Sequence, residues 1–243
     1  MINGGQTIAP LFHGQRLRRH SLRDLLDGLF YLVKTGCQWR LLPACFPPWQ
    51  SLYYHFRRWR RRGLIRRMHT LLRAITRRRA GRQMEPSLGL LDAQVVKTST
   101  QGGVRGYDGA KRTKGRKRHL VVDTMGLVMA VVVHSAHEAD SQAAVRVLHR
   151  IVSRRVVRVL ADAGYRYTPK GLVWRVFGFV LSIVPRSAQG RGFHVVPKRW
   201  VVERTFGWFE GYRRLFKDVE RETATSEAMI ELAMSRLMLS RIR

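Results

Sequence analysis

Three acidic residues, Asp92, Asp162 and Glu203, occupy positions that ordinary structural roles explain poorly. Asp92 lies inside the apolar run LGLLDAQVV, Asp162 ends the apolar run VVRVLAD, and Glu203 belongs to the aromatic-rich stretch RWVVERTFGWFEGYRRL. A carboxylate among buried strands costs free energy unless it holds a cation. Oxygen ligands that leave coordination positions open for phosphate suit divalent metal ions. The pattern therefore indicates metal-dependent phosphodiester chemistry.

Each of the three also has an ordinary interpretation when it is taken alone. Asp92 could cap a turn at the end of a strand, and Asp162 could cap the turn that follows it. Glu203 could pair with Arg199, which lies four residues earlier on a predicted helix. Spacing alone does not decide between these roles and catalysis.

Three further acids compete for a place in the site. Asp123 falls beside a predicted hairpin turn and Asp108 in a loop rich in glycine and lysine, so turn chemistry accounts for both. Asp140 stands at the start of a predicted helix, where the helix dipole favours an acid. We expect all three outside the site, with Asp123 the strongest competitor.

The charge of the chain points to its partner. The 243 residues include 46 Lys and Arg against 16 Asp and Glu, a formal net charge of +30. Such a field favours a polyanion, and phosphate contacts should dominate the affinity. We therefore expect double-stranded DNA as the partner.

The hydrophobic share of 45% is large enough for a packed core. The longest apolar stretch, LVMAVVVHSAH, is far shorter than the roughly 18 residues of a membrane-spanning helix. The first residues, MINGGQTIAP, lack the order of a secretory signal. We expect a cytoplasmic protein that associates with the nucleoid when it binds DNA.

The first third of the chain predicts helices. SLRDLLDGLFYLV carries apolar residues at spacings of three and four, with Ser21 as the N-cap and Gly36 at the end. After a proline-rich turn, a second helix begins near residue 51 and alternates aromatic residues with arginines. This resembles a helix-turn-helix whose second helix enters a major groove. We expect residues 1–80 to form a DNA-binding domain and 81–87 a linker.

Basic residues expected to contact DNA occur in the second helix, in the glycine-rich loop TSTQGGVRGYDGAKRTKGRKR and in the aromatic-rich stretch around Glu203. Glycines and cations together suit close approach to a phosphate backbone, although the loop could also be merely solvated. The aromatic residues of the second helix, Tyr53, Tyr54, Phe56 and Trp59, are expected in the core. The predicted DNA-binding residues are Arg57, Arg58, Arg60, Arg61, Arg105, Lys111, Lys114, Arg116, Lys117, Arg199, Arg213 and Arg214.

Residues 88–243 predict an α/β domain. LGLLDAQVVK, KRHLVVDTMG and GLVMAVVVHS predict three antiparallel strands, and HEADSQAAVRVLHRIV a helix that leads by a parallel crossover to the buried strand RRVVRVLAD. A helix around PKGLVWRVFG, a strand FVLSIVP and a long helix over 197–217 follow. This order describes a ribonuclease H-like mixed sheet flanked by helices, preceded by the small all-α domain.

The same segments carry a family resemblance. The pieces GLFYLVKTGCQWRLLP, FPPWQSLYYHFRRW, LLDAQVVKTS, GYDGAKRTKGRKRHLVVDTMGLVMAVVVHSAHEADSQAA, VLADAGY and RWVVERTFGWFEGYRRL follow one another over 22–220. The chain resembles insertion-sequence DDE transposases of the IS-five group. The resemblance implies that Asp92, Asp162 and Glu203 are the catalytic carboxylates and hold two Mg²⁺ ions, for which Mn²⁺ can substitute. It also implies binding of terminal inverted repeats and target DNA, strand cleavage, strand transfer and a homodimer on DNA.

Some features depart from the family. Its signature Tyr-x2-Arg-x3-Glu-x6-Lys is matched at Arg199 and Glu203, but Val196 and Glu210 replace its Tyr and Lys. The segment before residue 21 looks shorter than the family's usual beginning, which suggests a truncated copy. Two alternatives therefore stay open: an inactive relative that only binds DNA, and a metal-dependent nuclease without strand transfer.

Overall fold

The computed structural model describes residues 8–12, 19–100, 103–184 and 199–242. The chain divides into two compact units. The helical unit comprises Met1–Met84, Phe209–Lys217 and Ala228–Arg243, and the sheet unit comprises Glu85–Trp208 and Asp218–Glu227. Two C-terminal segments thus belong with the helical unit, whereas the expected domains were continuous in sequence. The division into a DNA-binding domain, a linker at 81–87 and a catalytic domain therefore stays a prediction.

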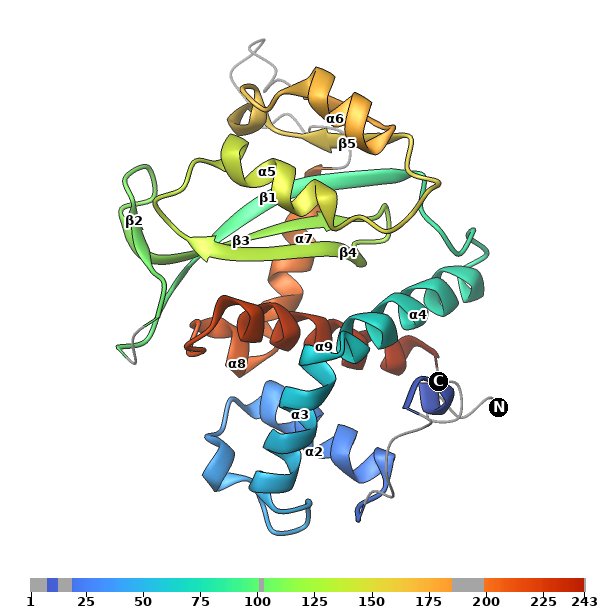
Figure 1. The fold of residues 1–243 in the computed structure, drawn as a ribbon, viewed down its shortest axis with the longest axis vertical. Helices are drawn as coiled ribbons and strands as arrows, with labels where there is room; N and C mark the ends of the chain where they lie inside the picture. Colours follow the sequence, from blue (N-terminus) through green and yellow to red (C-terminus); the bar gives the residue numbers. More distant parts are fainter. Residues whose placement is uncertain (1–7, 13–18, 101–102, 185–198, 243) are drawn as a thin grey trace. The chain divides into compact units, whose positions relative to one another are not determined.

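The helical unit begins with short helices, which Figure 1 shows in blue and cyan. Its elements are η1 (Ala9–Phe12), α2 (Leu22–Thr35), η2 (Trp39–Leu41), α3 (Trp49–Arg61), α4 (Leu64–Arg79), α8 (Arg213–Phe216) and most of α9 (Thr223–Ile242). The predicted caps of α2 are confirmed, since the Asp24 N–H donates to Ser21 Oγ at 3.1 Å and Gly36 has φ of 70°. The single helix predicted from residue 51 is two helices, because Gly63 adopts φ of 66° and ends α3.

Helix α3 buries one side and leaves the other side exposed to solvent. Phe56 and Trp59 are buried, and a methyl group at Gly28 of α2 would lie 2.9 Å from the Leu52 side chain. Tyr53 and Tyr54 are 38% and 55% exposed. The prediction that both are core residues was wrong, because the helical period turns them away from the side that Phe56 and Trp59 share.

The sheet unit contains six strands in one mixed sheet. They are β1 (Leu88–Lys97), β2 (Gly106–Asp108), β3 (Thr113–Val122), β4 (Val128–Ser135), β5 (Arg158–Ala161) and β6 (Val180–Ile183), in the order β2-β3-β1-β5-β6 with β4 also paired to β3. Strands β1, β3 and β4 form the predicted antiparallel meander, and β5 joins β1 in parallel. The predicted ribonuclease H-like arrangement of a mixed sheet flanked by helices is confirmed.

Helices cover both faces of this sheet. Helices α5 (Asp140–His149) and α6 (Lys170–Phe177) lie on one face, and α7 (Arg199–Glu210) lies on the other (Figure 1). The Thr205 hydroxyl donates to the Gly126 carbonyl at 2.8 Å, which fixes α7 to the turn between β3 and β4. Because both faces are covered, β4 is buried along its whole length.

The long helix predicted over 197–217 is interrupted. Helix α7 ends at Glu210, and α8 begins only at Arg213. The break falls at Gly211 and Tyr212, where Tyr212 adopts an extended conformation with φ of −122°. Glycine is a poor helix residue, so the chain changes direction here at little cost.

The edge of the sheet at β4 is covered from within the chain. Val133 N–H donates to the Glu227 carboxylate at 3.0 Å, and Arg150 donates to the Val131 carbonyl at 2.8 Å. These side chains occupy backbone groups that an open edge would offer to another strand. Among the described helices, none is both long and apolar enough to cross a membrane.

Candidate active site

Asp92 and Asp162 lie side by side on neighbouring parallel strands. Leu91 of β1 is opposite Ala161 of β5, and each acid is the next residue along its strand. Asp92 Oδ1 accepts the Ala93 N–H at 2.7 Å, and Asp162 Oδ1 accepts the Gly164 N–H at 2.9 Å. Asp162 therefore caps the short helix η3 (Ala163–Tyr165), as its structural interpretation proposed, while it also stands beside Asp92.

A third carboxylate, that of Asp140, lies near Asp162. A methyl group placed on Gly164 would be 3.0 Å from Asp162 Oδ1 and 3.6 Å from Asp140 Oδ2. These two oxygens are thus separated by no more than the sum of the two distances. Asp140, at the start of α5, is close to Asp162, although its position in the sequence had indicated only a helix-start role.

Tyr165 is a buried residue whose hydroxyl is influenced by the charges of these acids. Its side chain is 1% exposed, and its hydroxyl has no hydrogen-bond partner among the residues that the structure describes. Burial raises the Tyr165 pKa well above its ordinary value, and the charges of Asp92, Asp140 and Asp162 raise it further. The hydroxyl therefore keeps its proton near neutral pH.

Two stacked histidines lie behind Asp140. His119 Nδ1 is 2.7 Å from His134 Nε2, and His134 Nδ1 is 2.8 Å from the Ser135 carbonyl. Burial lowers the pKa of His119 well below its usual value, followed by the charges of His134 and Lys117. The His134 pKa is also lowered, again chiefly by burial. Both rings are therefore neutral at physiological pH.

Glu203 occupies a different environment. Its neighbours Val201, Val202 and Phe206 are buried, whereas Glu203 is on the exposed face of α7. Within residues 8–12, 19–100, 103–184 and 199–242, no three His, Cys, Asp or Glu side chains are grouped tightly enough to hold a metal ion. The structure thus brings Asp92 and Asp162 together but does not place Glu203 in a closed site with them.

The donor set fits a divalent cation. Asp92 and Asp162 supply hard carboxylate oxygens at neighbouring positions, which is the ligand chemistry that Mg²⁺ requires. Gly164 keeps the space beside Asp162 clear, since a side chain there would contact the Asp162 carboxylate. These features are compatible with a cation that retains water or phosphate as its other ligands.

The competing acids have structural roles. Asp123 is fully buried and accepts hydrogen bonds from the Met125 and Leu127 N–H groups at 2.8 and 2.9 Å. Asp108 accepts the Lys111 N–H at 2.9 Å and pairs with Lys117. Both acids therefore stabilise turns, as predicted.

Arg116 requires a correction. It was predicted to contact DNA, but its side chain is 0% exposed and pairs with Asp218 at 3.0 Å. It also donates to Ser226 Oγ and to the carbonyls of Val104, Glu220 and Arg221. The buried guanidinium ties β3 to the segment before α9, so the prediction of a DNA contact was wrong.

Lys117 and Arg214 are also buried, although both were predicted to contact DNA. Lys117 Nζ lies 3.3 Å from Asp108 and 3.0 Å from Asp140, and it donates to the Glu138 carbonyl. Arg214 donates to the Cys37 carbonyl at 2.9 Å. These cations have internal partners, so the predicted DNA contacts were wrong for them as well.

The other predicted DNA-binding residues are accessible where the structure describes them. Arg57, Arg61, Arg105, Lys111, Lys114 and Arg213 are exposed, and Arg58 and Arg60 are partly buried. The Arg57 guanidinium lies over the Tyr53 ring, and Arg58 donates to the Tyr54 hydroxyl at 2.8 Å. The side chain of Arg199, and all of Val196, are outside the described part of the chain.

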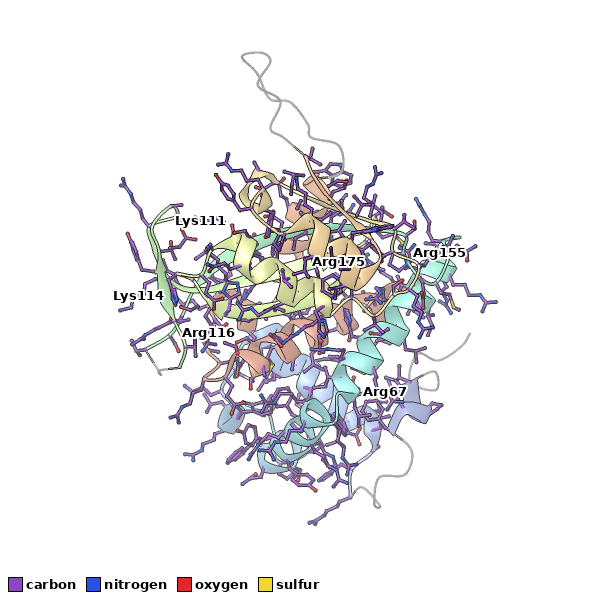
Figure 2. The ribbon with its side chains drawn as sticks, turned by 45° about the horizontal axis from the view of Figure 1, so that its top comes forward. Arg67, Lys111, Lys114, Arg116, Arg155 and Arg175 are labelled. Carbon is purple, nitrogen blue, oxygen red and sulfur yellow. The ribbon has the colours of Figure 1, made fainter. Side chains whose placement is uncertain are left out.

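Lys111 connects the basic loop to the carboxylates. Its Nζ lies 3.5 Å from the Ala93 carbonyl, one residue beyond Asp92. Figure 2 shows Lys111 and Lys114 at the end of the sheet unit that carries β2. This part of the loop therefore adjoins Asp92, as predicted.

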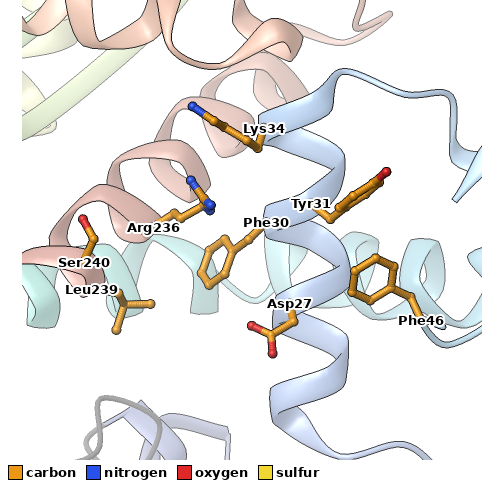
Figure 3. Close-up of a pocket in the computed structure, with 8 residues that line it drawn as sticks. All are labelled: Asp27, Phe30, Tyr31, Lys34, Phe46, Arg236, Leu239 and Ser240. Carbon is orange, nitrogen blue, oxygen red and sulfur yellow. The ribbon is translucent and has the colours of Figure 1, made fainter. Parts of the chain in front are cut away.

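A cavity of about 500 Å³ lies in the helical unit. Figure 3 shows that Asp27, Lys34 and Arg236 contribute its charged groups. Aromatic side chains from α2 and its neighbourhood form much of the remaining wall. None of the predicted site residues lines it.

Comparison with known proteins now defines the class. Residues 83–238, more than half of the chain, match the family described as "Transposase DDE domain", and residues 6–69 match "Putative transposase of IS4/5 family". The chain belongs to the DDE transposase domain family, which confirms the resemblance found in the sequence.

A particular relative is the "Putative transposase for insertion sequence element IS402" of Burkholderia cepacia. The two proteins are 29% identical over 127 residues, which cover 49% of this chain and 60% of the relative. The match thus spans less than two thirds of that protein.

Proposed function

We propose that this chain binds the terminal inverted repeats of a DNA insertion element, cuts the DNA there and joins the ends to target DNA. Asp92, Asp162 and Glu203 would hold two Mg²⁺ ions, for which Mn²⁺ can substitute. The observation that carries the proposal is the adjacent placement of Asp92 and Asp162 on parallel strands within the part of the chain that matches the family.

Bound divalent ions would activate the attacking hydroxyl and stabilise the departing oxygen of the scissile phosphate. The chain's own contribution is to fix the carboxylates. The Ala93 and Gly164 N–H groups each hold one oxygen of Asp92 and Asp162, which limits rotation of these side chains. Lys111, close to Asp92, would contact the adjacent DNA backbone.

The same residues can serve both cutting and joining. In each step an oxygen nucleophile forms a new bond to phosphorus while another P–O bond breaks. The nucleophile is water in hydrolysis and a DNA 3′-hydroxyl in strand transfer. No covalent intermediate with a protein side chain is needed, so one set of carboxylates suffices.

Support for Glu203 comes from the family motif. Its Arg-x3-Glu spacing is matched by Arg199 and Glu203. Exposure on α7 leaves the Glu203 carboxylate accessible to DNA and ions.

DNA binding would use the exposed arginines of α3 together with the basic loop before β3. Arg57 and Arg61 are accessible, and Tyr53 beneath Arg57 restrains its guanidinium. Because two element ends must be held together for transfer, we propose that the chain acts as a homodimer on DNA.

The test is a cleavage and joining assay with purified protein, Mg²⁺ and DNA that carries the element ends. Asp92→Asn and Asp162→Asn should each reduce cleavage by at least roughly a thousandfold, because bound metal ions contribute several kcal/mol to such reactions. DNA affinity should stay within a few-fold. Glu203→Gln should lower cleavage similarly, and Asp24→Asn, an exposed acid of α2, is the matched control.

Different failures have different meanings. Cleavage without joining to an added target would identify a nuclease that lacks strand transfer. DNA binding without cleavage by the unsubstituted chain would identify an inactive relative. If Asp92→Asn abolished DNA binding itself, the catalytic role of Asp92 would be contradicted.

A further inference from the structure

Helix α7 carries a stack of three side chains along one face. The Arg204 guanidinium lies between two indole rings, with its central carbon 4.7 Å from the ring centre of Trp200 and 5.0 Å from that of Trp208. The three residues are spaced four apart, so they follow one another along the helix surface. Attraction between the cation and the aromatic faces stabilises this arrangement. We call Trp200, Arg204 and Trp208 the α7 stack.

The inner end of the α7 stack is anchored to the sheet. A methyl group placed on Gly126, in the turn between β3 and β4, would lie 3.0 Å from the Trp208 ring. Arg204 donates to the carbonyl of Met125 in the same turn at 3.0 Å. The inner indole and the guanidinium are therefore fixed against this turn before any ligand binds.

The outer end of the α7 stack is accessible. Trp200 is 49% exposed, whereas Arg204 and Trp208 are partly buried. The guanidinium lies over the Trp200 ring, so it restrains the ring without covering all of it. A flat ligand that stacks on a ring already held in place loses less of its binding energy to the ordering of side chains.

The neighbours of the α7 stack indicate what approaches it. Glu203, the proposed catalytic acid, lies beside Arg204 and three residues after Trp200, so it shares their part of the helix surface. One turn later, a methyl group on Gly207 would meet no described atom within 4 Å beyond its chain neighbours and its own helix backbone. Glycine weakens a helix, and no described side chain requires it here. The surface beside Glu203 is therefore low and open to close approach.

The chemistry of this surface favours an unpaired nucleobase. The net charge of +30 favours a DNA strand as the ligand over most proteins. Bases within a duplex stack on one another and offer only their edges, whereas an unpaired base can stack on an aromatic side chain. An exposed indole beside an arginine is the combination that binds single strands.

We propose that Trp200 is a stacking platform for an unpaired nucleobase of a DNA strand beside Glu203, with Arg204 as the residue that positions its ring. The proposal deepens the proposed function and rests on it, since it takes DNA as the partner. Every base has an aromatic face, so the platform would hold an opened strand without selecting its sequence. It would keep that strand next to the proposed catalytic acid.

Binding of two single strands of equal length to the full chain, measured by fluorescence anisotropy in EDTA, tests the platform. One strand is oligothymidine, and the other is the same sugar-phosphate chain without bases. Trp200→Leu should weaken binding of oligothymidine about fivefold or more and that of the strand without bases less than about twofold, because stacking requires a base. Trp200→Phe keeps an aromatic ring and should bind oligothymidine within about threefold of the unsubstituted chain.

Two further variants complete the test. Trp174→Leu, on α6, is the matched control, because its indole is 59% exposed in the same unit. It should bind both strands like the unsubstituted chain. Arg204→Lys keeps the charge but loses the planar group that stacks on the rings, so it should weaken binding of oligothymidine and spare the strand without bases.

Urea denaturation establishes that each variant is folded, and Arg204→Lys carries the test if Trp200→Leu is not. Equal weakening for both strands would mean that Trp200 only supports the fold, and unchanged binding of both would mean that it does not contact DNA. Unchanged binding with a loss of self-association in sedimentation would assign Trp200 to contact with a second copy. Each of these results overturns the platform and leaves the proposed function standing. If the unsubstituted chain binds neither single strands nor duplex DNA, the proposed function fails as well.

Discussion

The arginines of α3 and the basic residues of β3 look alike in the sequence but have different environments. On α3, Arg57 and Arg61 lie on the exposed side of a helix that buries only its other side. On β3, Arg116 and Lys117 are buried, because the strand lies inside a sheet with both faces covered. A cluster of positive charge therefore indicates a DNA contact only where the element leaves one side open to solvent.

The largest effect is expected when Arg116 is replaced. Arg116→Met removes a buried cation and leaves Asp218 without its ion-pair partner, so we expect a decrease of about 3–5 kcal/mol in unfolding free energy. Urea denaturation measures the change. Arg57→Met on α3 should alter stability by less than about 0.5 kcal/mol. A stable Arg116→Met protein with weakened DNA binding would restore the role that the sequence had indicated.

A second prediction concerns His69 of α4, a buried basic residue of the helical unit. Burial, together with smaller contributions from the charges of Arg73 and Arg66, lowers the pKa of His69 to about 3. Unfolded chains bind more protons than the folded state below pH 6.5, so stability should fall as the pH decreases from there toward 3.

Between pH 7 and pH 5 this single group should remove about 2 kcal/mol of stability. Denaturation curves of the unsubstituted chain and of His69→Gln at both pH values would isolate the contribution. The variant should show a smaller decrease in stability on acidification. Equal decreases in the two proteins would mean that His69 titrates normally.

The smallest effect is expected on DNA binding by the arginines of α3. Neutralising Arg57 and Arg61 should weaken binding to any DNA sequence by roughly tenfold and reduce the salt slope by about 0.9 for each phosphate that the protein no longer neutralises. Arg155→Gln with Arg175→Gln, exposed residues of the sheet unit, is the matched control for net charge (Figure 2). Equal weakening by both pairs would indicate that overall charge, not α3, governs affinity.

Much of the fold was predictable because its signals are local. The cap at Ser21, the end of α2 at Gly36 and the alternation of strands and helices after residue 88 follow from side chains within a few residues of each other. The break at Gly63 was missed although glycine marked it, because the basic pattern continues across it. The C-terminal helix α9 had no prediction, since its residues carry no motif.

The candidate site was predictable in part. Asp92 and Asp162 end up adjacent because parallel strands align residues of the same register, and the apolar runs around them identified those strands. The proximity of Asp140 to Asp162 was not predicted, because it depends on contacts with residues of other elements. The acid that follows β4 and opens α5 was the available signal, and a helix-start role explained it equally well.

The amino-acid sequence alone was enough to predict the family, the strands β1, β3, β4, β5 and β6 with the helix α5 among them, and the adjacent placement of Asp92 and Asp162, because propensity, periodicity and register act over short ranges or along paired strands. Which cations are buried became clear only from the tertiary contacts. Those outcomes depend on what packs against each face. Desolvation makes an internal charge find a partner wherever the fold supplies one, as Arg116 finds Asp218 from a distant part of the chain.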